Sequence, residues 1–496
     1  MARIKIDDLL TEYETKKKEE SKPQTVINLS EIYSRHLKTS DFLHSVQHPS
    51  GLRYIYHSFF GLGMLLKNQM NDLLNGFRTP RPISHIKDVP LKILLEFVRR
   101  GFLVEADIPE REKVINQFTD TTPKVVSRLG LKVATSCNFS CYHCIHFASE
   151  DLDGRPTKIK IMPFETAKRA IDWVANGLIK NGQTQMSIAF GGGEPLINWP
   201  TIQKILNYTK TNYKSHLDIN FAINTNLALI TQEMVRTFKK YHVPIIASLD
   251  GTRAGNDSVR QTKTGKPTFD LIMKGFKRLL IGGIPTKMLY VVLTSKNLDS
   301  MDDSFIQFLS QNGITSVTLD IDSVDRLDQP LHIVIHKIIE LKKAAKRKNI
   351  MVTGFWARPF AKIISEEKNG GTHFCDSMAG KRIDILPDGN VYSCSYTDIN
   401  LGHLDNLTKE DPFSSLTKSE AYQKMVNSRR VGQIDWCRGC EVEGLCGGGC
   451  YTTVAHSEKK NNQQILAYHC ELYRQCTKEL LLNRIEQKIS TNDVTN

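Results

Sequence analysis

The chain has 496 residues, of which 40% are hydrophobic and 24% are charged. This balance is typical of folded globular domains, and the length suits roughly two to four of them, which excludes disordered, collagen-like and disulfide-stapled chains. The 66 basic and 53 acidic residues leave a net charge of +13, which favours an anionic partner such as nucleic acid or an acidic peptide. The sequence has no apolar run of about 18 residues and no signal-like start, so we expect a cytoplasmic protein without a membrane partner.

The segment from residue 25 to residue 115 is predicted to form a small winged-helix-like domain. The aromatic run Tyr54–Tyr56 indicates a strand. Apolar residues at intervals of three and four then predict a helix from Leu66 to Phe77 and a second helix from Leu91 to Val98, followed by a strand at Phe102–Val104. The order strand, helix, helix, strand is the basis of this prediction.

From Leu129 to Asp322, short β-branched strands alternate with amphipathic helices, a pattern that predicts parallel β/α units. Six strands are expected, at residues 131–134, 186–190, 219–223, 245–249, 289–293 and 317–320. The helices between them are expected at residues 164–179, 202–208, 233–241, 269–280 and 304–311. Six units are too few for a complete eight-fold barrel, so we predict an α/β fold with a partial (β/α)6 TIM-like barrel.

Composition and pattern together divide the chain into six segments. They are a flexible N-terminus (1–24), the winged-helix-like domain (25–115), the partial barrel (125–330), a linker with a basic helix (331–370), a C-terminal cysteine-rich domain (371–480) and a C-terminal tail (481–496). Eight of the eleven cysteines follow the basic helix. In a chain without an export signal, clustered thiols are expected to bind metal rather than to form disulfides.

The first cysteine cluster comes directly after the first barrel strand, where the carboxyl ends of strands gather functional groups. Cys137, Cys141 and Cys144 leave three and two residues between them. Three cysteines can hold a 4Fe-4S cluster by three of its irons and leave the fourth iron open to a substrate or cofactor. The spacing alone also allows a zinc site completed by His143 or His146.

This Cys-x3-Cys-x2-Cys motif, after the first strand of a six-unit barrel, resembles that of the radical SAM superfamily, whose members use S-adenosylmethionine (SAM). Gly191–Pro195, at the end of the second strand, resembles the family's Gly-Gly-Glu segment. The run from Ser248 to Gly251, with Arg260 beyond it, resembles a segment of the peptide-modifying members, although singly Asp250 fits an ordinary turn and Arg260 a surface ion pair. The resemblance implies SAM contacts from Gly192, Gly193, Glu194, Asn226, Ser248, Asp250 and Arg260.

The resemblance also implies the reaction. SAM would bind the open iron through its amino and carboxylate groups, and one electron would cleave it to methionine and a 5′-deoxyadenosyl radical that abstracts hydrogen from an unactivated carbon. The cofactors carry this chemistry, so no catalytic side chain is assigned from the sequence. An external electron donor of the flavodoxin or ferredoxin type is the implied partner for the electron.

The C-terminal cysteines resemble the SPASM extension of radical SAM enzymes, which carries auxiliary 4Fe-4S clusters, although the residues alone also allow two zinc ribbons. By the family's pattern one cluster takes Cys437, Cys440, Cys446 and Cys470, and the other takes Cys375, Cys394 and Cys450. The second set is one ligand short. Either Cys476 supplies it, or the cluster keeps an open iron for a substrate thiolate, which is our hypothesis.

We therefore expect a radical SAM peptide maturase, an oxidoreductase-type enzyme that forms a thioether or carbon–carbon crosslink in a ribosomally made precursor peptide. Residues 25–115 resemble the peptide-recognition domain fused to such maturases, which binds the leader of the precursor as an added strand; a helical linker domain is the alternative.

Two other functions are weighed. A sulfatase-type or other protein-modifying maturase ranks lower. Ser395 stands at the position where the resemblance implies an Asp that acts as the base in sulfatase maturases. An RNA-binding or RNA-modifying iron-sulfur protein ranks lower still, because no aromatic residues interleave with the basic run from Lys342 to Lys348.

Overall fold

The computed structural model describes residues 35–86, 89–118, 125–150, 161–365, 371–407 and 412–491. The expected flexible N-terminus, residues 1–24, lies outside them. The chain divides into two compact units, residues 1–40 with 72–108 and residues 41–71 with 109–496. No helix in the parts of the chain that are described is long and apolar enough to cross a membrane.

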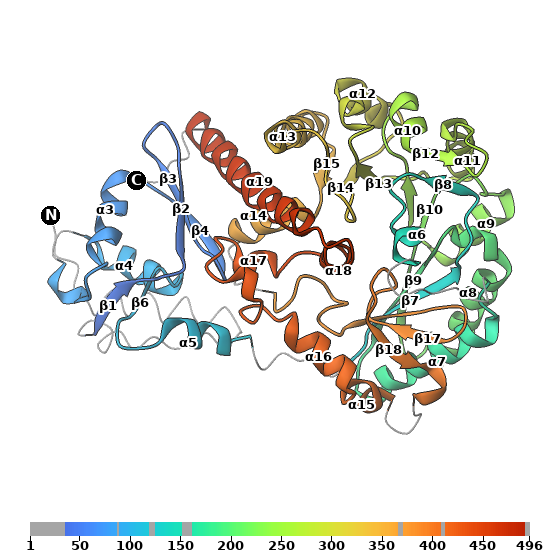
Figure 1. Ribbon diagram of the computed structural model, residues 1–496, viewed down its shortest axis with the longest axis horizontal. Coiled ribbons are helices and arrows are strands. Elements are labelled where there is room, and N and C mark those ends of the chain that lie inside the picture. Colours follow the sequence, from blue (N-terminus) through green and yellow to red (C-terminus); the bar gives the residue numbers. More distant parts are fainter. Residues whose placement is uncertain are drawn as a thin grey trace. The chain divides into compact units, whose positions relative to one another are not determined.

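The larger unit is built on a sheet of ten strands in the order β15-β14-β13-β11-β10-β9-β7-β16-β17-β18. All six predicted barrel strands are present and pair in parallel with their neighbours (Figure 1). They are β7 (Arg128–Ala134), β9 (Gln185–Gly192), β10 (Asp218–Thr225), β11 (Ile245–Ser248), β13 (Met288–Leu293) and β14 (Ser316–Ile321). The predicted α/β fold with a partial barrel is therefore confirmed.

The same sheet continues beyond the six predicted strands at both ends. At one edge β15 (Met351–Thr353) pairs in parallel with β14. At the other edge β16 (Arg382–Ile385) pairs in parallel with β7, and β17 (Asn390–Tyr392) and β18 (Asn400–His403) follow in antiparallel order. The first strands of the cysteine-rich segment thus extend the barrel sheet.

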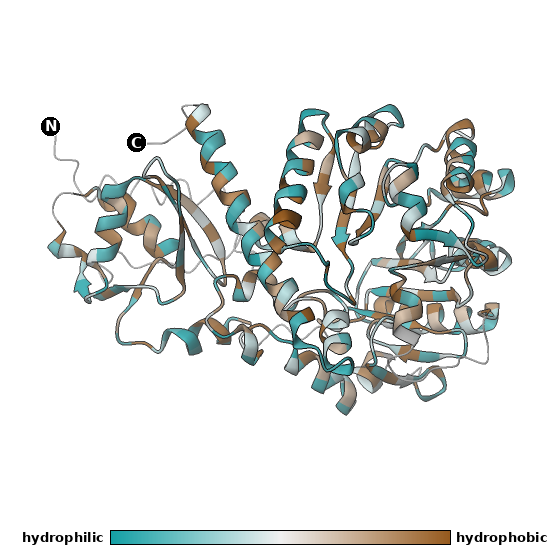
Figure 2. Cartoon of the chain, turned by 45° about the horizontal axis from the view of Figure 1, so that its top comes forward, coloured by the Kyte–Doolittle hydropathy of each residue, from teal (hydrophilic) through white to brown (hydrophobic). Residues whose placement is uncertain are grey.

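The predicted barrel helices cover the outer face of this sheet (Figure 1). They are α7 (Phe164–Lys180), α8 (Trp199–Tyr213), α9 (Gln232–Tyr241), α11 (Phe269–Ile281) and α12 (Asp303–Gln311), and the basic helix is α13 (Leu331–Arg347). Each carries both hydrophilic and hydrophobic residues (Figure 2), and the apolar ones pack in one core with alternate strand residues such as Leu289 and Val291 of β13. Because side chains alternate along a strand, Tyr290 and Val292 face the other, inner side of the sheet.

Further elements complete the larger unit. β8 (Phe139–Cys141) pairs with β12 (Arg260–Thr262) in a two-stranded sheet. The remaining helices are α5 (Glu110–Asn116), α6 (Ile145–Glu150), α10 (Arg253–Val259), α14 (Arg358–Ile363), α15 (Pro412–Thr417), α16 (Glu420–Ser428), α17 (Glu443–Cys446), α18 (Tyr451–Lys459) and α19 (Gln463–Ser490). An antiparallel sheet of β2 (Leu43–Gln47), β3 (Arg53–His57) and β4 (Gly61–Leu66) also belongs to this unit.

The smaller unit contains a three-stranded antiparallel sheet and a helix. The sheet has the order β5 (Arg81–Pro82), β1 (His36–Thr39), β6 (Leu103–Glu105), and the helix is α4 (Leu91–Arg99). A further helix, α3 (Asn68–Gly76), spans the boundary between the units.

The elements predicted for residues 25–115 are largely found, since Tyr54–Tyr56 lies in β3 and the two predicted helices correspond to α3 and α4. Leu66, however, ends a strand, β4, that the helical pattern concealed. The winged-helix likeness is not confirmed, because the described strands of this segment form two separate antiparallel sheets.

Candidate functional site

The first three cysteines lie in the segment between β7 and α6. Cys141 ends β8 and stands opposite Arg260 of β12, and the carbonyl of Cys144 accepts a hydrogen bond from Ala148 of α6. Burial, together with the nearby charges of Glu194 and the other two thiols, raises the pKa of Cys137 to about 12. Three thiols, one buried and two half-buried, that repel one another when ionised are a donor set that a bound cationic cluster would stabilise.

The histidines of this segment are engaged with other groups. A ring nitrogen of His146 is 2.8 Å from the carbonyl oxygen of Thr135, and Nε2 of His143 is 3.1 Å from Oδ2 of Asp250. With both histidines bound to other groups, the three thiols remain as the donors of this segment. Within the described ranges, no three His, Cys, Asp or Glu side chains, these thiols included, converge on a position for a single metal ion. Three separate thiols fit an iron-sulfur cluster, in which each binds a different iron and the fourth iron is open.

The glycine-rich turn after β9 runs against the loop that leads to Cys137. Gly192 has a φ of +126°, and a Cβ there would lie 1.8 Å from the carbonyl oxygen of Ala134. A Cβ on Gly193 would lie 2.4 Å from the carbonyl oxygen of Ser136. Only glycine permits this approach of the two chain segments, in which the N–H of Gly193 bonds to Ala134.

Glu194 follows this turn and is 1% exposed. Its Oε1 accepts hydrogen bonds from Leu196 N (3.1 Å) and Thr225 Oγ1 (2.7 Å), and its Oε2 accepts one from Asn226 N (2.9 Å). Burial raises the pKa of Glu194 to about 6 in spite of these bonds. The carboxylate therefore ties the end of β9 to the end of β10, and its expected contact with the SAM amino group remains a prediction.

Asn226 and Ser248 lie at the carboxyl ends of neighbouring strands. Asn226 Nδ2 donates to Asn138 Oδ1 at 2.8 Å and is 4.0 Å from Cys137 Sγ, so this side chain adjoins the cysteine loop. Ser248 Oγ donates to Asn224 Oδ1 at 2.8 Å on the next strand. The structure thus brings two of the predicted SAM-contact residues to the same end of the sheet as the first cysteine cluster.

Asp250 and Arg260 pair with each other inside the protein. Asp250 is 0% exposed; its Oδ2 is 2.7 Å from Arg260 Nε, and its Oδ1 accepts from Arg260 Nη2 at 3.1 Å and from Val292 N at 2.8 Å. Although burial acts in the opposite sense, Arg260 and His143 hold the pKa of Asp250 well below its usual range. Arg260 Nη1 lies 3.8 Å from Cys141 Sγ, so Asp250 fixes a cation beside the cysteine loop. The surface ion pair considered for Arg260 is excluded by its burial.

The C-terminal cysteines fall into two groups. Burial raises the pKa of Cys437, and the charges of Cys446, Cys470 and Cys440 raise it further, against the opposing effect of Arg429. Burial raises the pKa of Cys394 to about 12, with a contribution from the charge of Cys375. Burial also raises the pKa of Cys450, and the charge of Cys375 raises it further. These groups have the same members as the two ligand sets expected for the auxiliary clusters.

Cys476 is not brought to either group. It is 0% exposed on α19 and belongs to the main apolar core. Burial raises its pKa, with Glu479 as the further cause, and no other thiol contributes. The set of Cys375, Cys394 and Cys450 therefore consists of three thiols.

Sequence reasoning missed a polar cluster where β7 meets β16. Asp384 is 1% exposed; it accepts from Arg382 Nε at 2.8 Å and from the N–H and hydroxyl of Ser395 at 2.9 and 2.6 Å. Lys132 Nζ lies 3.6 Å from the centre of the Tyr396 ring. No local signal reveals this cluster, because β7 and β16 are far apart in the sequence and only their pairing unites them.

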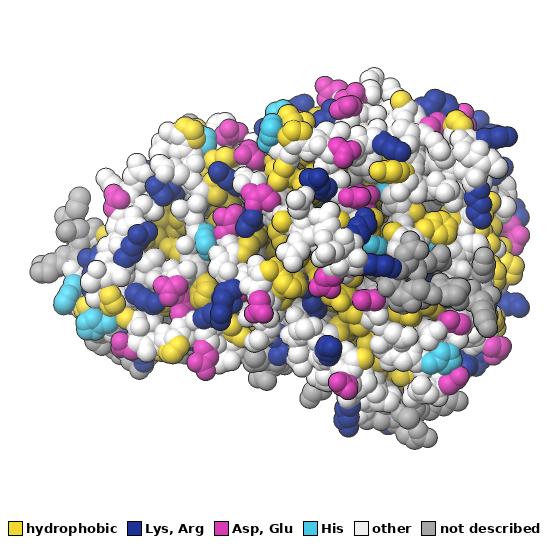
Figure 3. Space-filling model, viewed as in Figure 1, with side chains coloured by type: hydrophobic (Ala, Val, Ile, Leu, Met, Phe, Trp, Pro, Cys, Tyr) yellow, Lys and Arg dark blue, Asp and Glu magenta, His cyan; other side chains and the backbone are white. Residues whose placement is uncertain are grey.

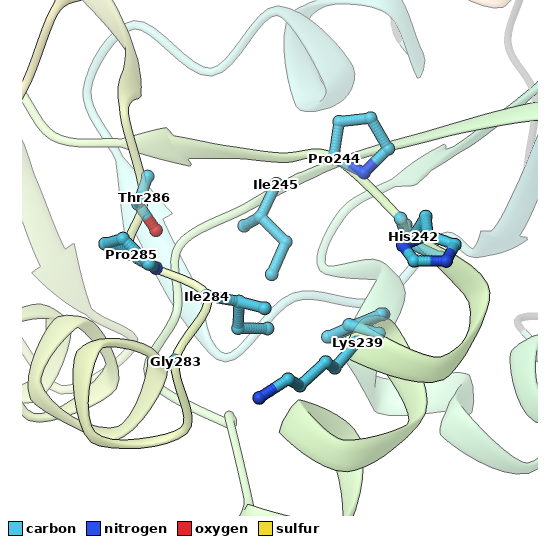
Figure 4. A pocket seen from close by; sticks show the side chains of 10 residues that line it. Lys239, His242, Pro244, Ile245, Gly283, Ile284, Pro285 and Thr286 are labelled. Atoms are coloured by element: carbon cyan, nitrogen blue, oxygen red, sulfur yellow. The ribbon is translucent and has the colours of Figure 1, made fainter.

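A surface pocket lies at the opposite, amino ends of the barrel strands (Figure 4). It is lined by Lys239 in the last turn of α9 and His242 directly after it, by Pro244 and Ile245 where β11 begins, and by residues 283–286 before β13. None of the residues predicted to bind a cofactor takes part in it, so it is separate from the candidate site.

Comparison with known proteins agrees with the sequence motifs. The family model of the radical SAM superfamily matches residues 131–306, and that of the SPASM iron-sulfur cluster-binding domain matches residues 375–441. The radical SAM cyclopropyl synthase TigE of Paramaledivibacter caminithermalis is 27% identical over 478 residues, 91% of this chain and 97% of that protein. A cysteine-type anaerobic sulfatase-maturating enzyme of Clostridium novyi is 23% identical over 352 residues, 66% of this chain and 88% of that enzyme. The solved structure of histidine-tagged anSMEcpe with bound AdoMet has a similar fold, with a TM-score of 0.58 at 16% identity over 75% of this chain and 96% of that one.

Proposed function

Because the chain belongs to the radical SAM superfamily and carries a SPASM iron-sulfur domain, we propose that it matures a precursor peptide by forming a thioether or carbon–carbon bond within it. The chain is a radical SAM enzyme that uses SAM and 4Fe-4S clusters. Its likeness to TigE extends over 91% of its length, and bond formation in a peptide is the activity class that this relationship supports.

One observation carries the proposal: a single buried side chain connects the two cysteine regions. Lys132 of β7 lies against the ring of Tyr396, two residues after Cys394. Burial raises the pKa of Cys144, and the charge of Lys132 partly offsets that rise. A substrate on the inner face of the sheet would therefore meet both the SAM-binding region and the set of Cys375, Cys394 and Cys450, as an oxidative crosslinking reaction requires.

The residues of this chain have separate tasks in the proposed reaction. When bound at the Cys137–Cys144 loop, SAM and the cluster supply the one-electron chemistry that removes a hydrogen atom from an unactivated carbon. We propose that Gly192, Gly193, Glu194, Asn226 and Ser248 line the SAM site, and that Asp250 holds Arg260 in place beside it. An arginine fixed by a buried carboxylate loses little entropy when it binds a further anionic group.

The set of Cys375, Cys394 and Cys450 is proposed to hold an auxiliary cluster with an open iron. The position of Cys476 in the apolar core supports this, because its charge is not among those that act on Cys394 or Cys450. A peptide thiolate bound there would be held for bond formation. The precursor's leader is proposed to bind the N-terminal region, and a flavodoxin or ferredoxin to supply the electron.

Sulfatase-type maturation is the second candidate, supported by the likeness to the Clostridium novyi enzyme. Asp384 bonds to Ser395 and offers a carboxylate near the position of the missing base. However, although burial acts against it, Arg382 holds the pKa of Asp384 at about 2, which makes this carboxylate a weak proton acceptor. This ranks the activity below crosslinking.

The contacts of the basic run on α13 argue against the RNA alternative. Lys342 Nζ bonds to the carbonyl oxygen of Val352 and Lys343 pairs with Glu340. On the face shown in Figure 3, Lys and Arg are interspersed with Asp and Glu rather than gathered in one stripe. A basic run that is used within the fold is a poor phosphate-binding surface.

The test is anaerobic incubation of the reconstituted enzyme with SAM, a strong reductant and the short peptide encoded beside its gene. We expect 5′-deoxyadenosine and a peptide lighter by two hydrogens, detected by mass spectrometry. Cys141→Ala should abolish both products, whereas Cys476→Ala, a matched change outside the ligand sets, should retain them. A wild-type enzyme that cleaves SAM but leaves every encoded peptide unchanged would contradict the proposal.

A further inference from the structure

A tyrosine and an aspartate form a buried pair on the inner side of the sheet. Tyr290 lies on β13 and Asp320 on the neighbouring strand β14. The Tyr290 hydroxyl donates to Asp320 Oδ2 at 3.2 Å, and the N–H of Phe355 donates to Asp320 Oδ1 at 2.6 Å. Asp320 is 3% exposed, whereas Tyr290 is half-buried. A molecule on this face would therefore meet the tyrosine before the aspartate.

Asp320 differs from Asp250 and Asp384, two other carboxylates buried at this sheet. Asp250 and Asp384 are each paired with an arginine, but none of the ion pairs among the described residues includes Asp320. Its neighbours are the Tyr290 hydroxyl, the N–H of Phe355 and, through space, Arg358 of α14 and Tyr473 of α19.

The guanidinium of Arg358 is bound to the carbonyl oxygen of Phe374, so it does not neutralise Asp320 directly. Burial is the largest influence on Asp320 and raises its pKa to about 6, against the opposing effects of Phe355, Tyr290 and Arg358. A carboxylate whose pKa lies near the working pH can both accept and release a proton.

The pair stands between the two cofactor regions. Tyr290 is the register partner of Ser248 on β11, a residue proposed to line the SAM site. Burial and Asp320 raise the pKa of Tyr290 well above its usual value, and the charges of Cys450 and Tyr396 contribute, so the hydroxyl also lies near the three-thiol set. This is where a peptide would lose hydrogen to the SAM side and an electron to the auxiliary side.

We propose that Tyr290 and Asp320 form a proton relay that takes up the proton released by the peptide during crosslinking, either from a thiol as it becomes the bound thiolate or from a carbon as a carbon–carbon bond closes. The proposal rests on the crosslinking function above. Closing one bond between two peptide atoms removes two hydrogens, one as a hydrogen atom taken by the SAM-derived radical and one as a proton with one electron. The electron would be accepted by an auxiliary iron-sulfur cluster held by the C-terminal cysteines. The proton binds the hydroxyl oxygen of Tyr290, whose own proton moves to Asp320 Oδ2 along the existing hydrogen bond.

Tyr290 is the member that contacts the peptide, and Asp320 is a positioning residue that acts through it. No other reactant is needed, because the hydrogen atom, the electron and the proton each have an acceptor.

The test compares Asp320→Asn and Tyr290→Phe in the reconstituted full-length enzyme with SAM, reductant and the precursor peptide. We expect crosslinked peptide to fall by about 100-fold, the contribution of a positioned acid–base group, while 5′-deoxyadenosine stays within about twofold of wild type, so that SAM cleavage becomes uncoupled. Asp320→Glu should restore part of the crosslinking. Tyr208→Phe, which breaks a similar tyrosine–aspartate bond on the outer helices (Tyr208 to Asp172, 2.6 Å), should change neither product.

A second measurement does not depend on turnover. Infrared spectroscopy of the protein without substrate should show a carboxyl band that titrates near pH 6, is missing in Asp320→Asn and shifts in Tyr290→Phe. Undiminished crosslinking in both variants, or loss of 5′-deoxyadenosine in parallel with crosslink, would overturn the relay. Failure of the proposed function would look different, because the wild-type enzyme itself would then leave the peptide unmodified.

Discussion

Replacing Asp250 by Asn should destabilise the folded chain, because it removes the negative charge that compensates Arg260 in the interior. Asp250 is fully buried, and its Oδ2 lies 2.7 Å from Arg260 Nε and 3.1 Å from His143 Nε2. Removing one member of a buried ion pair leaves the other charge without compensation in a medium of low polarity, and we expect a loss of about 3 kcal/mol in the free energy of unfolding. Asparagine keeps the volume and still offers an oxygen to the N–H of Val292, so the loss reports on charge rather than on packing.

The stability that the Asp250–Arg260 pair contributes depends on pH with a definite sign. Although burial opposes it, Arg260 and His143 depress the pKa of Asp250 in the folded chain. A depressed carboxyl pKa contributes stability that is present above the unfolded-state value of about 3.9 and is lost as the pH falls toward the folded-state value. The difference between wild type and Asp250→Asn should therefore stay constant from pH 7 to about pH 5 and shrink below about pH 4.

Urea unfolding of both proteins, followed anaerobically by circular dichroism, measures this difference. Asp270→Asn is the matched control, since Asp270 pairs with Arg253 at 2.6 Å but the two side chains are 68% and 58% exposed. We expect no measurable change from the control, because solvent screens an exposed pair. Equal shifts in the two variants, or an unshifted midpoint in Asp250→Asn, would refute the argument from burial.

Three further outcomes are expected. Cys394→Ser should lose one cluster's share of iron in a colorimetric assay while Cys476→Ser retains all of it; equal losses would place Cys476 among the ligands. Gly193→Ala should slow 5′-deoxyadenosine formation by about 100-fold, because its Cβ would lie 2.4 Å from the carbonyl oxygen of Ser136 and displace the Cys137 loop; an unchanged rate would contradict this. Burial raises the pKa of Glu194 to about 6, so the folded chain should lose stability as the pH rises from about 4.5 to 6, and this slope of melting temperature against pH should flatten in Glu194→Gln.

The barrel could be predicted from sequence because its signals are local. Each strand buries alternate residues against a helix that follows it directly, so the period of apolar residues changes from two to 3.6 along each unit. The same reasoning misassigned Leu66, which ends β4, because an apolar residue next to a helix fits either pattern. The cysteine motifs could also be recognised from the sequence, because the spacing of the cysteines identifies them.

What sequence reasoning missed depends on pairing between distant segments. Asp384 meets Ser395 only because β16 turns back beside the end of β17. Tyr290 meets Asp320 only because β13 and β14 lie in one particular register. Asp250 and Arg260 were both assigned to SAM, yet no local feature indicated that they bind each other. The contact between Tyr290 and Asp320 depends on strand register, which a one-residue slip would abolish.

The parallel pairing of β16 with β7 has a mechanical consequence. Residues Arg382 to Ile385 pair with Arg128 to Leu131. The first part of the auxiliary-cluster region is therefore attached to the barrel by the hydrogen bonds of a β-sheet rather than by a flexible hinge. The distance over which an electron would tunnel between the cofactors is then set when the chain folds and stays constant through turnover. A truncation ahead of Arg382 would remove β16 from the barrel sheet as well as the auxiliary-cluster region.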